Sequence, residues 1–137
     1  MKLTLETAQT IAKAARKKAK AMGIPMVITL VDDGANLVLS ERMDGAMIAG
    51  IRISYDKAYT AAATTFPTHE LGKLSQPGQE VYGLANTDGG RIIIFGGGIP
   101  LKDKSGSLVG AIGVSGGIAS QDQQVAQAGV DAFSNLA

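Results

Sequence analysis

Cysteine is absent from this chain of 137 residues, and so is tryptophan. Without a thiol the protein can form no disulfide, no thiolate zinc site and no cysteine nucleophile. Only three tyrosines and three phenylalanines are present, and the formal net charge is +1. The chain therefore offers neither the basic surface nor the stacking side chains of nucleic-acid-binding proteins, and we expect no nucleic-acid partner.

Long apolar runs are also lacking. No segment approaches the about eighteen consecutive apolar residues that a membrane helix needs, and residues 1–9 lack the apolar run of a signal peptide. These absences predict a cytoplasmic protein without a membrane partner. The length and the hydrophobic content of 45% fit one globular domain, residues 1–137.

Helical periodicity is clearest at the two ends of the chain. Apolar residues recur at spacings of three and four over residues 5–22, which predicts an amphipathic helix. Ser120 and Gln123 form a capping-box pair that predicts the start of a final helix. Asp44 is predicted to cap a further helix over about residues 46–64.

The remaining apolar runs predict strands. The turn residues "DDGAN" separate two of these runs, which indicates a β-hairpin. Gly and Pro recur through residues 65–90, which lie between the helix predicted over residues 46–64 and the next apolar run. Short helical turns are expected in this segment at 69–74 and 80–85. The order αββα–βββα predicts an α+β fold with one five-stranded antiparallel sheet. The expected strands are 26–31, 37–43, 91–95, one that begins at 99–101, and 107–114.

Glycine is concentrated in one part of the chain, because ten of the 18 glycines lie between residues 89 and 117. The run "IIIFGGGIP" places three of them directly after large apolar residues. Such a cluster can form a nest of backbone N–H groups for an anion, or it can allow another part of the protein to pack closely. Neither glycine cluster matches a dinucleotide fingerprint or a P-loop, and "GVSGG" lacks the following histidine of a serine hydrolase.

His69 is the only histidine and lies in the interrupted segment. Imidazole titrates near neutrality, so His69 can act as a ligand or an acid–base group, or it can be a loop residue without a role. The lysines of the first predicted helix are most simply a solvated face.

Four blocks of the sequence resemble one protein family. They are "LVDDGANLVLSERMDGA", "KAYTA", "FGGGIPL" and "GAIGVSGGIASQDQQVAQAG". The sequence resembles the GlcG/HbpS family, which includes the carboxy-terminal domain of PduO-type corrinoid adenosyltransferases. The resemblance implies a profilin-like α/β/α sandwich and a homo-oligomer of even order. It also implies that some members bind haem, whereas others occur among glycolate, propanediol or glycerol utilisation genes.

The resemblance suggests a non-enzymatic, small-molecule-binding protein for haem or a related tetrapyrrole. Haem-binding relatives of the PduO type have a histidine near the first helix, where this chain has Lys17 and Lys18. The iron ligand would then be His69, a Tyr, a Met or a hydroxyl, and the two lysines would bind propionates. The residues expected to bind the ligand are Lys17, Lys18, Arg42, Lys57, His69, Gly96, Gly97, Gly98, Ser115, Gly116 and Gly117, with His69 as the metal ligand.

Two other functions stay open. The chain could be an accessory protein or an enzyme acting on a small hydroxy acid or diol, whose carboxylate the glycine loop would hold. It could also be a purely structural assembly module. Four charged residues in the resembling blocks, near predicted element ends, could either supply charge to a ligand site or form a structural ion-pair set. They are Arg42, Asp44, Lys57 and Asp122.

Overall fold

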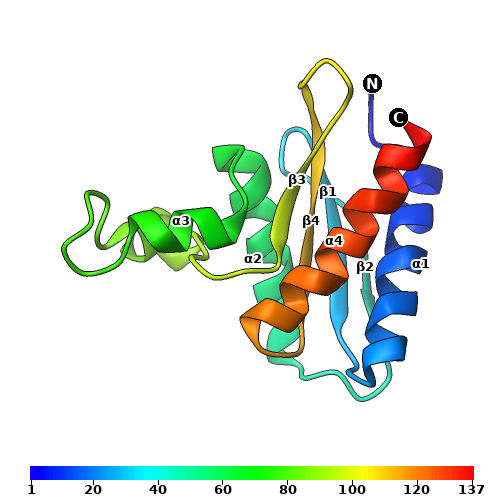
Figure 1. Ribbon diagram of the computed structural model, residues 1–137, viewed down its shortest axis with the longest axis horizontal. Helices are drawn as coiled ribbons and strands as arrows, with labels where there is room; N and C mark the ends of the chain where they lie inside the picture. Colours follow the sequence, from blue (N-terminus) through cyan, green and yellow to red (C-terminus); the bar gives the residue numbers. More distant parts are fainter.

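The computed structural model describes residues 1–137 as an α/β/α sandwich with an arm that projects from one side (Figure 1). Four antiparallel strands form one sheet in the order β2-β1-β4-β3. Helices α1 and α4 lie side by side on one face of the sheet, and α2 covers the other. The elements are α1 (Leu5–Met22), β1 (Val27–Asp32), β2 (Leu37–Arg42), α2 (Ala49–Thr64), α3 (Thr68–Leu74), β3 (Gly98–Lys102), β4 (Leu108–Ser115) and α4 (Ala119–Leu136).

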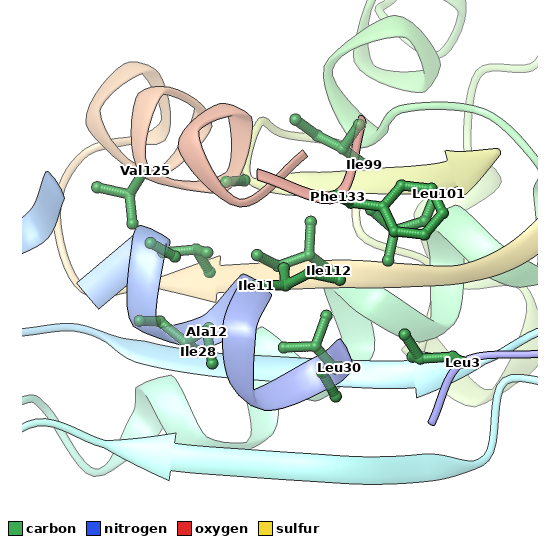
Figure 2. Packing of buried hydrophobic residues seen from close by; sticks show 14 of the residues in the cluster. Leu3, Ile11, Ala12, Ile28, Leu30, Ile99, Leu101, Ile112, Val125 and Phe133 are labelled. Atoms are coloured by element: carbon green, nitrogen blue, oxygen red, sulfur yellow. The ribbon is translucent and has the colours of Figure 1, made fainter. Parts of the chain in front are cut away.

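The larger hydrophobic core fills the space between the sheet and the α1–α4 layer. Figure 2 shows Ile11 of α1 beside Ile112 of β4, and Phe133 of α4 beside Leu101 of β3. The inner stripe of α1 is mostly alanine, which lets this helix pack close to the sheet and to α4. The core cluster on the α2 side is smaller and is again built on alanine: its buried members are Val31, Ala58, Ala61, Ala62 and Ala111.

The first helix and the hairpin follow the sequence prediction. Helix α1 begins after Thr4, whose hydroxyl accepts a hydrogen bond from the Thr7 amide, and ends at Gly23 with φ +71°. Two predicted caps are wrong. Helix α2 begins at Ala49 rather than near Ala46, so Asp44 does not cap it. Helix α4 begins one residue before Ser120, and the Gln121 side chain accepts the Ile118 amide proton instead.

The predicted five-stranded sheet is wrong by one strand, because residues 91–95 do not join it. The hydroxyl of Thr60, on α2, accepts a hydrogen bond from the Ile93 amide at 3.0 Å. The same hydroxyl shares its proton between the Asp56 carbonyl of α2 at 2.7 Å and, more weakly, the Arg91 carbonyl at 3.2 Å. The apolar run therefore lies along α2 and takes its backbone partners from a helix side chain. The order is αββαα–ββα.

Residues 66–95 form the projecting arm, which leaves the sandwich at the end of α2 and returns at the start of β3 (Figure 1). It contains α3, as predicted for residues 69–74, and two short 3₁₀ turns, Leu84–Asn86 and Asp88–Gly90. The chain termini lie together at one end of the sandwich, and the starts of α2 and α4 lie at the opposite end. No helix has the length and apolarity required to cross a membrane.

Candidate functional site

A buried ion pair lies where α2, α4 and the end of β4 meet. The Lys57 Nζ atom is 2.8 Å from Asp122 Oδ2, and the two side chains are 0% and 3% exposed. Lys57 Nζ also donates to the Val114 carbonyl at 2.8 Å. It lies 5.0 Å from the centre of the Phe95 ring, in a cation–π contact. The ammonium group is thus surrounded by protein on every side.

Burial and pairing act in opposite directions on this pair. Burial lowers the pKa of Lys57 below its ordinary 10.5 and raises the pKa of Asp122 above 3.8, because a low dielectric disfavours both charges. The hydrogen bond and the attraction between the two groups oppose each shift. The Gly116 and Gly117 amides also favour the Asp122 carboxylate, and the Gly117 amide donates to Asp122 Oδ1 at 2.8 Å.

The two glycine clusters lie at neighbouring strand ends, around this ion pair. Gly97 N donates to the side chain of Gln123, and Gly98 N donates to the Thr68 hydroxyl, each at 3.0 Å. Ser115 is the last residue of β4 and is buried. The amides that a ligand carboxylate would need at Gly97, Gly98 and Gly117 are already bound to the protein's own side chains. The clusters therefore pack closely against the protein itself, and these three amides are not free to bind a small acid.

Gly97 shows why a glycine is needed in this loop. Its φ is +124°, which L side chains rarely adopt. A Cβ atom built there would lie 2.5 Å from the Val114 carbonyl oxygen and 2.7 Å from Lys57 Nζ. The backbone approaches the ion pair so closely that no side chain fits between them.

Three other predicted cations lie elsewhere on the surface: Lys17 and Lys18 on α1, with Lys18 beside α4, and Arg42 at the end of β2. Lys17 and Lys18 line two different shallow hollows of about 260 Å³ each. Arg42 lines a third hollow, of about 300 Å³, together with Arg16, Lys20, Met43 and Asp44. Arg16 pairs with Glu41, whereas Lys20 and Arg42 form no ion pair. These two cations are available to an anion.

His69 lies on α3, on the side of the molecule opposite α1 (Figure 1). Its Nε2 atom is 3.1 Å from Glu70 Oε1, while Nδ1 is buried without a hydrogen-bond partner. No group of three or more His, Cys, Asp or Glu side chains is placed to hold a metal ion. Within one chain, His69 and the lysines of α1 cannot contact the same ligand, because the sandwich separates them.

Sequence analysis missed a second polar cluster, which fixes the arm to α2. Asp56 pairs with Arg91 through Oδ1 and with Arg52 through Oδ2, both at 3.1 Å. The Arg91 guanidinium lies 3.5 Å from the centre of the Tyr59 ring, and the Tyr59 hydroxyl donates to Asp88. The hydrogen bond to Asp88 raises the pKa of Tyr59 above its ordinary 10.0, so Tyr59 is a poor source of a phenolate ligand. The spacing of these residues along the chain gives no pattern that could have identified the cluster.

The chain is thus a small α/β/α sandwich with a buried ion pair, and its glycine clusters pack against the protein's own side chains. The family described as "Haem degrading protein HbpS-like" matches residues 3–131. The chain belongs to this family, and the family resemblance predicted from the sequence is confirmed.

Three similar proteins illustrate the relationship. The "Uncharacterized 15.0 kDa protein in dhaT-dhaS intergenic region" of Citrobacter freundii is 43% identical over 98% of this chain and 94% of its own length. The corrinoid adenosyltransferase PduO of Citrobacter freundii is 34% identical over 97% of this chain, which spans only 39% of that protein. A crystal structure described as a PduOC:heme complex has a TM-score of 0.92 and 33% identity, covering 96% of this chain and 95% of the other.

Proposed function

We propose that this protein binds haem or a related tetrapyrrole at its surface, as part of a homo-oligomer of even order. The observation that carries the proposal is the hollow between α1 and the end of β2. Lys20 and Arg42 are free of carboxylate partners there, and the adjoining loop exposes Met47 and Ile48 by 55% and 78%. A tetrapyrrole presents carboxylates beside a large apolar ring, which matches cations beside exposed apolar side chains. The likeness to the PduOC:heme complex supports the same ligand class.

The propionates would be bound by cations of this surface. Arg42 can bind a carboxylate through two N–H groups, whereas a lysine presents a point charge. Lys17 and Lys18 lie on α1, outside the hollow that Arg42 lines, and would contribute to the positive field around it. Lys57 has no part in this binding, because its ammonium group is buried against Asp122.

The iron ligand would come from one of two places. Met47 is exposed on the loop beside the hollow and belongs to the same chain. His69 would have to come from a second copy, and its Nε2 atom would have to leave Glu70 to bind iron. Both thioether and imidazole are haem ligands in proteins. The hollow of about 300 Å³ is at the small end of ligand pockets, so a second copy would also be needed to enclose the ring.

A hemin titration followed through the Soret band tests the proposal. We expect saturable binding by the wild type and an affinity several-fold weaker for Arg42→Gln, with an unchanged Soret maximum. Met47→Leu or His69→Ala should move the Soret maximum, and the variant that moves it identifies the ligand. Lys102→Gln is the control, since Lys102 is an exposed cation on β3 without an ion pair. If the wild type binds hemin no better than an unrelated protein of equal charge, the proposal fails.

A further inference from the structure

The cations of α1 are concentrated in two turns of the helix, and the near-neutral net charge of the chain conceals them. Five of the 13 Lys and Arg residues lie within residues 13–20, whereas residues 7–31 contain no acidic residue. The rest of the chain has eight cations and 12 acidic residues, so it is net negative. Positive charge is therefore concentrated on α1. The five cations are Lys13, Arg16, Lys17, Lys18 and Lys20.

Most of these cations have no acidic partner. Arg16 pairs with Glu41 of β2, whereas the four lysines are exposed and form no ion pair. Lys13 and Lys17 lie four residues apart, a spacing at which like charges destabilise a helix. The helix dipole stabilises cations only in the last turn, which contains Lys20. The sequence thus places repelling charges side by side without compensation, as proteins do at functional sites.

Four of the cations line one shallow hollow of about 260 Å³ on α1, and no other residue lines it. Their spacing of three and four residues places them on one face of the helix. Lysine and arginine side chains carry N–H donors and no acceptor. A ligand that matches the hollow must therefore present negative charge and acceptors, without donors of its own. The four residues are Lys13, Arg16, Lys17 and Lys20.

We propose that this hollow, which we call the α1 hollow, binds a short chain of phosphates such as tripolyphosphate. A deprotonated phosphate chain presents only acceptor oxygens and holds several negative charges close together, which matches four neighbouring cations. No apolar side chain lines the α1 hollow, so it offers nothing to insert into a lipid. Residues 1–54 contain no aromatic residue on which a base could stack, so the phosphates alone are recognised.

The α1 hollow differs from the hollow proposed for haem, although Arg16 and Lys20 line both. Lys13 and Lys17 line the α1 hollow and not the haem hollow, whereas Arg42 lines only the haem hollow. Phosphate binding should therefore depend on Lys13 and Lys17 and be independent of Arg42. The inference goes beyond the proposed function, and the two can be tested separately.

Calorimetric titration of the full-length chain with sodium tripolyphosphate, at low salt and without hemin, tests the proposal. We expect saturable binding that weakens as sodium chloride is added, because the cations are exposed. Lys13→Gln/Lys17→Gln should weaken binding about tenfold. Lys102→Gln/Lys104→Gln is the matched control, since it removes two exposed cations elsewhere, and it should stay within about twofold of the wild type, as should Arg42→Gln. A wild type that does not bind, or equal losses in both double variants, overturns the proposal.

Two further ligands test what the α1 hollow recognises. ATP carries the same phosphate chain on a nucleoside, so its affinity should lie within about tenfold of that of tripolyphosphate. Much tighter binding of ATP would show that the nucleoside is recognised and would contradict the proposal. Citrate should bind several-fold more weakly, and equal binding of citrate would show that α1 attracts any multivalent anion, which also contradicts it. None of these titrations contains hemin, so their failure leaves the haem proposal unaffected.

Discussion

Lys57 of α2 and Asp122 of α4 form a buried ion pair across 65 residues of sequence, with 2.8 Å between nitrogen and oxygen. The pair joins the helix on one face of the sheet to a helix on the other, at the end of β4. Breaking a buried pair leaves one charge without a partner, which is more damaging than removing both charges. The stability of the sandwich should therefore depend on the two residues jointly.

Replacing only Lys57 by Met should lower the free energy of unfolding by about 3–5 kcal/mol, because the Asp122 carboxylate stays buried and unpaired. The double variant Lys57→Met/Asp122→Asn should recover much of this loss, since the asparagine oxygen can still accept the Gly117 amide proton. Urea unfolding of the wild type, both single variants and the double variant measures the coupling. Additive losses would show that the two residues do not act as a pair.

Gly97→Ala should destabilise the protein by about 1–3 kcal/mol more than Gly78→Ala. Both glycines have positive φ, but +124° at Gly97 lies farther from the left-handed helical region than +85° at Gly78, so an alanine is also more strained at position 97. Only at Gly97 does a Cβ atom meet other atoms, whereas nothing lies within 4 Å at Gly78. Thermal unfolding of the two variants side by side measures the combined cost of crowding and backbone strain at Gly97. Equal losses would mean that the loop can move away from the Lys57 ammonium.

Arg91→Gln should loosen the arm, because it removes both the pair with Asp56 and the stacking on Tyr59. The expected loss is about 1–3 kcal/mol, together with faster chymotryptic cleavage at Tyr82. Arg52→Gln is the control, since Arg52 pairs with the same carboxylate but is 69% exposed. It should change stability by less than about 1 kcal/mol. Similar cleavage rates in both variants would argue against Arg91 as the anchor.

Asp88→Asn should lower the pKa of Tyr59 toward its ordinary 10.0, because the hydrogen bond to the carboxylate is the main cause of the raised value. The folded state holds this proton more tightly than the unfolded state, so the stabilisation is present below pH 10 and is lost as the pH rises through the folded pKa. Phenolate absorbance in a Tyr55→Phe/Tyr82→Phe background reports Tyr59 alone. An identical titration curve after Asp88→Asn would rule out the hydrogen bond as the cause.

Periodicity predicted the helices and the hairpin because those elements depend on local pattern. The alanine stripe of α1 and the "DDGAN" turn each specify their own structure, and both are found. Residues 91–95 are different, since an isoleucine run fits a strand but its amide partner is the Thr60 hydroxyl, more than thirty residues earlier. No local sequence pattern predicts the contact between Ile93 and Thr60.

The candidate site shows the same limit. Sequence analysis placed Lys57 and Asp122 in resembling blocks and left open whether they bind a ligand or each other, and the structure pairs them. Glycine clusters indicated a close approach at residues 96–98, but the approaching group is the protein itself. The separation of His69 from the lysines of α1 follows from the sandwich topology, which composition and spacing do not specify.

Both termini emerge at the end of the sandwich that lies away from the starts of α2 and α4 (Figure 1). A protein fused to either terminus would therefore be held clear of the hollow proposed for ligand binding. The order of the two parts in such a fusion would matter little, because both attachment points face the same way. Fluorescent labels or affinity tags can be placed at either end on the same reasoning.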